Sequence, residues 1–221
     1  SPLASCSSLQ ELRIWDNDQI QELDLSPLAS CSSLHALEIG KNENLEELVL
    51  PASSSLQSLI IKWNNQLEVL ILPDATALQS LEIDGNRGLK RLDLAPLASS
   101  SSLQSLKIEK NENLEELVLP ISSSILTLEI RDNRQLKELD LAPLASCSAL
   151  QTLLIGFNNQ LRELDLSPLA SCSSLQSLEI DSIGQVQELN LSPLASCSCL
   201  QVLRIGENEK LKKLVLPTSS S

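Results

Sequence analysis

Leucine and isoleucine recur along this chain in one pattern, L-x-x-L-x-I-x-x-N-x-x-L-x-x-L-x-L, which returns every 22 or 25 residues. In residues 26–50, Leu34, Leu37 and Ile39 are spaced as in a short strand with one buried face. The same L-x-x-L-x-L spacing returns after Asn42. Each copy therefore predicts one coil with two sets of inward-pointing side chains, and the stacked coils predict a solenoid with a parallel sheet on its concave side.

Nine such units cover the chain as a single domain. They are residues 1–25, 26–50, 51–72, 73–94, 95–119, 120–141, 142–166, 167–191 and 192–216, followed by a tail at 217–221. The connectors carry Pro and Ser where helix formers would be needed, so we expect an α/β-type solenoid that is strongly β-rich, with little or no helix. The repeat pattern is cut at both ends, and neither end carries a polar cap. We therefore expect a piece of a longer protein, with self-association through the uncapped ends.

The residue before the last leucine of a unit follows the length of the next connector. Before a long connector it is polar, as in Asp24, Asp93, Asp140, Asp165 and Asn190. Before a short connector it is apolar, as in Val49, Ile71, Val118 and Val215. Asp and Asn commonly accept hydrogen bonds from the backbone at turns, so we expect the polar residues to cap the longer loops.

One asparagine follows the first apolar triad of almost every unit. These residues are Asn17, Asn42, Asn64, Asn86, Asn111, Asn133, Asn158 and Asn208, and Ile183 takes the position in the eighth unit. Where the chain turns inward its backbone groups lose their strand partners, and a carboxamide can both donate to them and accept from them. We expect a structural asparagine ladder with a weak rung at Ile183.

Five of the six cysteines occupy one connector position in different units, namely Cys6, Cys31, Cys147, Cys172 and Cys197. Ser100 fills the same position in the fifth unit, so the site needs a small side chain rather than half of a disulfide. Cys199 stands apart, and the only histidine, His35, is far away in sequence. We expect reduced thiols, as in a cytosolic protein, and no metal site.

The positions that the repeat leaves free on the predicted sheet hold all three aromatic residues of the chain. Exposed aromatic residues among charges are typical of binding hot spots. Trp63 with Ile60, and Phe157 with Leu154, lie four units apart, or ~20 Å at the usual strand spacing, which suits a protein surface. The candidate partner-binding residues are Arg13, Trp15, Ile60, Lys62, Trp63, Lys107, Arg131, Leu154 and Phe157.

Composition narrows the function further. The net charge of −13 argues against nucleic acid and anionic membranes as partners and favours a basic protein partner. No apolar run approaches the ~20 residues of a membrane span. Catalysis would have to rely on His35 as the only imidazole base, and no phosphate-binding loop or metal-ligand spacing occurs, so we expect no catalytic residues, no cofactor and no metal. Asn190-Leu191-Ser192 matches a glycosylation sequon, which is a weak signal.

The phrase L-x-x-L-x-I-x-x-N is the leucine-rich-repeat signature. The run C-S-S-L-Q-S-L-E-I at residues 172–180, with related runs at Cys31 and Ser100, resembles the repeat region of plant intracellular nucleotide-binding leucine-rich-repeat immune receptors, especially those of grasses. The resemblance covers the whole chain, although its units are unusually uniform, and the nucleotide-binding module is absent. It implies a cytoplasmic module that recognises pathogen effectors in disease resistance and innate immunity.

Two hypotheses follow for the function. The first is a non-catalytic protein-recognition module that binds a pathogen effector or another receptor domain on its concave face. The alternative is a structural or engineered scaffold, made by idealising one unit, with no evolved ligand. A third hypothesis, an ice-binding coil, is disfavoured because the exposed columns are charged and irregular. Clustered aromatic residues favour recognition, whereas uniform columns would favour the scaffold.

Overall fold

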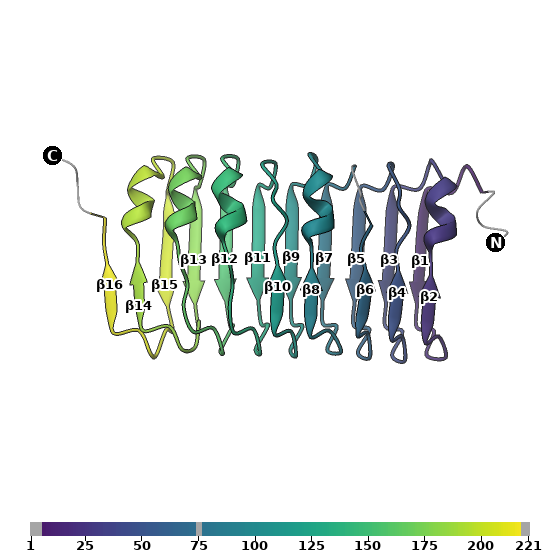
Figure 1. Cartoon of the computed structure of the whole chain (residues 1–221), viewed down its shortest axis with the longest axis horizontal. Helices are drawn as coiled ribbons and strands as arrows, with labels where there is room; N and C mark the ends of the chain where they lie inside the picture. The colour runs from purple at the N-terminus through teal and green to yellow at the C-terminus, as the bar shows by residue number, and fades with distance from the viewer. Residues whose placement is uncertain (1–5, 74–76, 218–221) are drawn as a thin grey trace.

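The computed structural model describes residues 6–73 and 77–217. The coils stack side by side in one row from the N-terminus to the C-terminus (Figure 1). The predicted mid-pattern ends, in residues 1–3 and 218–221, and part of the P-D-A-T connector lie outside the described residues.

A parallel sheet runs the length of the row, and in the described part of the chain it contains nine strands. Equal positions of successive repeats pair with one another, as Leu37 does with Leu59 and Ile39 with Ile61. In order across the sheet the strands are β1 (Glu11–Trp15), β3 (Ala36–Gly40), β5 (Ser58–Lys62), β7 (Ser80–Asp84), β9 (Ser105–Glu109), β11 (Thr127–Arg131), β12 (Thr152–Gly156), β13 (Ser177–Asp181) and β15 (Val202–Gly206). The predicted parallel sheet is confirmed.

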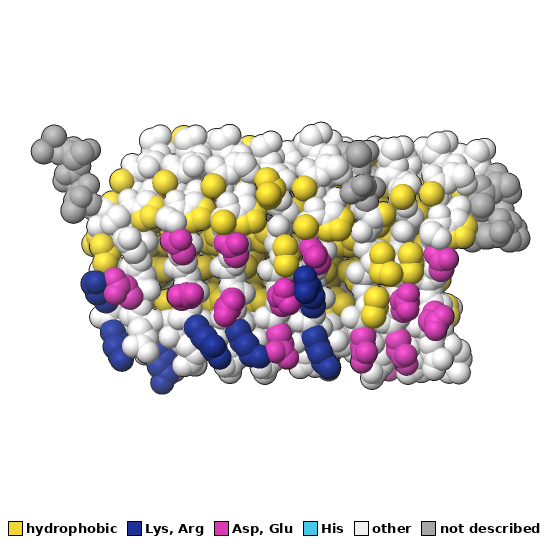
Figure 2. All heavy atoms as spheres, viewed as in Figure 1, with side chains coloured by type: hydrophobic (Ala, Val, Ile, Leu, Met, Phe, Trp, Pro, Cys, Tyr) yellow, Lys and Arg dark blue, Asp and Glu magenta, His cyan; other side chains and the backbone are white. Residues whose placement is uncertain are grey.

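The opposite side of each coil has only short strands. They form three small parallel sheets in the described residues, with β2 (Glu22–Asp24), β4 (Glu47–Val49) and β6 (Val69–Ile71) in one, β8 (Arg91–Asp93) and β10 (Glu116–Val118) in another, and β14 (Glu188–Asn190) and β16 (Lys213–Val215) in the third. On this face, acidic and basic side chains stand in rows over a band of apolar side chains (Figure 2).

The helix content of the described residues is small, as expected, and it lies in the long connectors. Five of them, in the described residues, form short 3₁₀ helices: η2 (Ser26–Ser30), η3 (Ala95–Ser99), η4 (Ala142–Ser146), η5 (Ser167–Ser171) and η6 (Ser192–Ser196). Proline stands in the first turn of each, where its fixed φ suits a helix and its missing N–H is no loss. The 3₁₀ helix needs only short runs, so poor helix formers do not prevent it.

The predicted capping of these loops is confirmed. Oδ1 of Asp24 accepts a hydrogen bond from the backbone N–H of Ser26 (2.8 Å), and the hydrogen bonds from Ser26 hold the pKa of that carboxyl below its usual value. The same contact precedes each of the other four 3₁₀ helices in the described residues, at Asp93, Asp140, Asp165 and Asn190. No helix in residues 6–73 and 77–217 is both long and apolar enough to cross a membrane.

Leucine and isoleucine side chains from both sides of the coils fill one continuous core. A column of small polar side chains joins neighbouring coils at the connector. The Ser100 hydroxyl donates to the carbonyl of Leu78 (2.8 Å), and in the same repeat position the Cys147 thiol donates to the carbonyl of Ile125 (3.2 Å). Burial raises the pKa of the Cys172 thiol to about 12, so this thiol stays protonated and unreactive at neutral pH.

Buried asparagine amides link the coils at the turn that follows each main strand. Oδ1 of Asn111 accepts from the backbone N–H of Asn86 (3.0 Å), and its Nδ2 donates to the carbonyl of Ile83 (3.0 Å). The same two contacts to the preceding coil repeat at Asn42, Asn64, Asn86, Asn133, Asn158 and Asn208. Asn17, in the first coil, is exposed and donates to the carbonyl of Trp15 (2.7 Å).

Candidate functional site

The main sheet face consists of the outward side chains of the nine-stranded sheet, together with the residue directly before each ladder position. All nine candidate binding residues lie on it. Arg13 and Trp15 are on β1, Ile60 and Lys62 on β5 with Trp63 directly after it, Lys107 on β9, Arg131 on β11, and Leu154 on β12 with Phe157 directly after it. The sheet order brings them together as two groups on either side of Lys107.

The residue before each ladder position adopts a positive φ. At Trp63 and Phe157 the angles are 56° and 55°. Bulky side chains rarely take this left-handed conformation, because it crowds the side chain against the backbone. The turn imposes it on every coil, so two aromatic side chains are held at the rim of the sheet at some cost in strain.

The first group is an aromatic cluster made by Trp15, Trp63 and Lys41. The two indole rings meet edge to face with their centroids 5.8 Å apart, and Nζ of Lys41 lies 5.7 Å from both centroids. Glycines in neighbouring coils make room for the rings. A Cβ at Gly40 would lie 2.8 Å from Trp15, and one at Gly85 would lie 2.4 Å from Trp63. Trp63 nevertheless remains 40% exposed, so much of its ring is open to a ligand.

The second group is centred on Phe157. The Arg131 guanidinium lies 5.6 Å from the centre of the phenyl ring. It also reaches across β12, past Gly156, to within 3.7 Å of Oδ2 of Asp181. Burial raises the pKa of Asp181, and the charge of Arg131 opposes that shift. Phe157 and Leu154 are half-buried, so this group offers less open apolar surface than the tryptophan cluster.

Between the two groups the charges pair both across neighbouring coils and within β9. Lys62 lies 2.8 Å from Glu82, and Lys107 lies 3.2 Å from Glu109 and 3.6 Å from Glu82. Nζ of Lys110 lies 3.6 Å from Oδ1 of Asp84.

Asp84 itself is buried, and burial raises its pKa. Its Oδ1 has no hydrogen-bond partner among the described residues. The sequence pattern named Lys62 and Lys107 as binding residues but not their carboxylate partners. Glu82 stands one repeat away from both lysines, and Glu109 lies on the same strand as Lys107.

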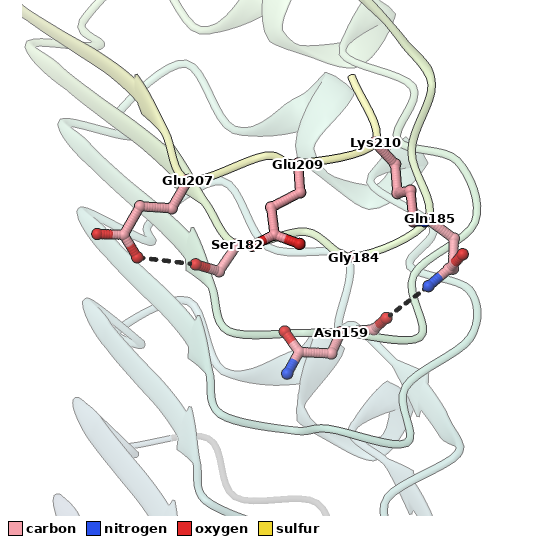
Figure 3. Close-up of a pocket in the computed structure, with 7 residues that line it drawn as sticks. All are labelled: Asn159, Ser182, Gly184, Gln185, Glu207, Glu209 and Lys210. Atoms are coloured by element: carbon pink, nitrogen blue, oxygen red, sulfur yellow. Dashed lines mark hydrogen bonds between the residues drawn. The ribbon is translucent and has the colours of Figure 1, made fainter. Parts of the chain in front are cut away.

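A depression of about 280 Å³ lies where the asparagine ladder is interrupted (Figure 3). Ile183 offers no side-chain acceptor to the backbone N–H of Asn158, and the chain instead passes close to the preceding coil. A Cβ at Gly184 would lie 1.8 Å from the carbonyl oxygen of Asn159, and the φ of Gly184 is +50°. Beside it, Ser182 Oγ donates to Glu207 (3.2 Å) and Gln185 Nε2 to the Asn159 carbonyl (3.5 Å).

No group of His, Cys, Asp and Glu residues in the described ranges has the arrangement of a metal site. Several acidic residues of the face pair with lysine or arginine, as Glu82 does with Lys62 and Asp181 with Arg131.

No protein-family model and no curated protein matches this sequence. The leucine-rich-repeat domain of the type III effector XopL superposes with a TM-score of 0.52 at 18% identity, over 91% of this chain and 70% of that one. Internalin C2 from Listeria monocytogenes gives a TM-score of 0.49 at 24% identity, over 92% of this chain and 74% of that one. The fold is a leucine-rich-repeat solenoid. These structures do not test the resemblance of this leucine-rich-repeat chain to plant immune receptors, which stays a prediction.

Proposed function

We propose that this leucine-rich-repeat domain is a non-catalytic protein-recognition module that binds a partner protein on its main sheet face. Trp63 and Phe157 anchor the partner, and Trp15, Ile60 and Leu154 enlarge the apolar contact. The charges of Arg13, Lys62, Lys107 and Arg131 orient it. On the resemblance given above, the partner is a pathogen effector or another receptor domain in the plant cytoplasm, and the role is in disease resistance.

The observation that carries this proposal is the exposure of Trp63 at a strained turn. A tryptophan that is 40% exposed at a positive φ serves no need of the core, because the core consists of aliphatic side chains on the inner face. From β5 to β12 the sheet order makes four steps, so Trp63 and Phe157 lie ~20 Å apart at the usual strand spacing. Two anchors at that separation match a protein surface better than a small molecule.

The test compares binding of a captured partner to the wild type and to two anchor variants. Trp63→Ala and Phe157→Ala should fold normally, because neither side chain belongs to the core, and each should bind the partner at least ~30-fold more weakly. Affinity is measured by surface plasmon resonance with the domain immobilised.

Ile121→Ala is the matched control, since Ile121 is a 64% exposed apolar side chain on a connector away from the main sheet face. Its binding should equal that of the wild type. Equal affinity of both anchor variants and the wild type would refute the assignment of the site. Absence of any partner for a domain that folds cooperatively would favour the alternative, a scaffold without an evolved ligand.

A further inference from the structure

The rim of the main sheet face, where β3, β5, β7 and β9 end, contains a depression of about 440 Å³. Trp63 lines it, and the indole ring reaches over Gly85 in the next coil, where any side chain would collide with it. Lys41 and Lys110 hold the same repeat position as Trp63 in the coils on either side of this pair, and both line the depression. An aromatic side chain is thus flanked by two ammonium groups.

Lys41 differs from the other cations of the face. Lys62, Lys107, Lys110 and Arg131 each lie 3.7 Å or less from a carboxylate oxygen. In residues 6–73 and 77–217, no carboxylate lies within ion-pair distance of Lys41, and its Nζ instead stands 5.7 Å from the centroids of both indole rings. An ammonium fixed against two aromatic rings and lacking a counter-ion is suited to a ligand carboxylate.

The surroundings limit the size of that ligand. Three cations, Lys41, Arg87 and Lys110, and two carboxylates, Glu43 and Glu112, line the depression, so the excess among the lining residues is one positive charge. Arg87 pairs with Glu112 (3.5 Å) and Lys110 pairs with Asp84 (3.6 Å), which leaves Lys41 as the lining cation outside these ion pairs. The whole chain carries a net charge of −13, which favours basic groups over the rest of the partner surface and repels a long polyanion such as a nucleic acid. A short acidic segment brings one or two carboxylates to Lys41 without placing further negative charge over the acidic remainder of the molecule.

We propose that this depression binds a short acidic segment of the partner protein, with a carboxylate against Lys41 and a neighbouring apolar side chain against Trp63. The inference rests on the proposed function and adds the chemistry of the partner at one end of the face. Trp15 supports the site, because its ring packs against both Trp63 and Lys41.

The test uses the tryptophan fluorescence of the domain, since Trp15 and Trp63 are its only tryptophans and the chain has no tyrosine. The probe is the blocked heptapeptide GGEFEGG, which carries two carboxylates, and GGQFQGG is its neutral counterpart. The acidic peptide should shift the emission with a dissociation constant of about 1 mM, and the neutral peptide should bind ~10-fold more weakly. High salt, about 0.5 M, should weaken the binding of the acidic peptide only.

Charge-matched variants locate the effect. Lys41→Gln with Lys110→Gln should weaken binding of the acidic peptide by ~10-fold. Lys90→Gln with Lys212→Gln removes the same charge from exposed positions on the opposite side of the coils and should leave binding unchanged. Equal loss in both double variants, equal binding of the two peptides, or no binding up to about 10 mM would each overturn the proposal.

Failure here can be told apart from failure of the proposed function. If the captured partner still depends on Trp63 and Phe157 but not on Lys41 and Lys110, protein recognition stands and the acidic segment is refuted. If the acidic peptide binds as described while the natural partner ignores both anchors, the depression is an acidic-peptide site and the partner binds elsewhere.

Discussion

Replacing Asn111 with alanine is the most direct test of how the coils are held together. Oδ1 of Asn111 accepts from the backbone N–H of Asn86 (3.0 Å), and its Nδ2 donates to the carbonyl of Ile83 (3.0 Å). All three residues are fully buried. Alanine offers neither contact, so one backbone donor and one backbone acceptor lose their partners in the interior of the solenoid.

The magnitude follows from those two groups. Each buried polar group left without a partner costs ~1–3 kcal/mol, so Asn111→Ala should lower the free energy of unfolding by ~2–6 kcal/mol. A water molecule that entered the vacated space and bonded both groups would bring the loss toward the lower end of that range. The loss should be measured by urea unfolding monitored by far-UV circular dichroism.

Asn17→Ala is the matched control, because Asn17 occupies the same repeat position but is exposed in the first coil. Its Nδ2 donates to the carbonyl of Trp15 in its own coil and to Oδ1 of Asn42, and both groups keep other partners or access to water. The expected loss is within ~0.5 kcal/mol, as for most surface substitutions. Equal, small losses in Asn17→Ala and Asn111→Ala would refute the argument that the amide ladder satisfies buried backbone groups.

Three further predictions follow from the same geometry. Gly184→Ala should strongly destabilise the domain in thermal unfolding, because its Cβ would lie 1.8 Å from a backbone oxygen at a positive φ, whereas Gly206→Ala, with nothing within 4 Å of its Cβ, should be nearly neutral. The exposed Cys199 should react with Ellman's reagent in the native protein at pH 8, whereas Cys172, whose pKa is raised to about 12, should react only after unfolding; a Cys172 disulfide found by mass spectrometry would contradict this. Burial raises the pKa of Asp84, so its ionisation disfavours the folded state as the pH rises through that pKa; Asp84→Asn should therefore raise the melting temperature at pH 7, and the gain should vanish at pH 3.

The sequence predicted the fold because one spacing rule repeats along the whole chain. The alternation of inward apolar and outward residues around Leu37 and Ile39 is enough to place a strand. Repetition of that strand in every coil leads to parallel pairing in register. Capping by Asp24 could also be predicted, since a short polar side chain before a turn has few other partners. The 3₁₀ helices could not, because a single turn of helix depends on the space between neighbouring coils more than on the propensity of its own residues.

The candidate site was predictable in its members but not in its contacts. Repeat position alone places Trp63 and Phe157 at the rim. Which cation each one meets depends on how far Lys41 and Arg131 reach across a neighbouring coil, and that distance is set by side-chain rotamers. Gly40, in the second coil, is a sequence signal for the packing of Trp15, whose ring lies over it. The glycine becomes informative only when equal repeat positions are compared.

The ladder and the binding face depend on each other through the turn that joins them. Trp63 stands directly before Asn64, whose Oδ1 and Nδ2 bond the preceding coil, so the backbone that carries the indole is fixed by buried hydrogen bonds on its inner side. A partner that binds Trp63 therefore meets a side chain whose backbone is already ordered, and less conformational entropy is lost on binding. The same hydrogen bonds that hold the coils in register thus keep the anchors at a constant spacing along the sheet.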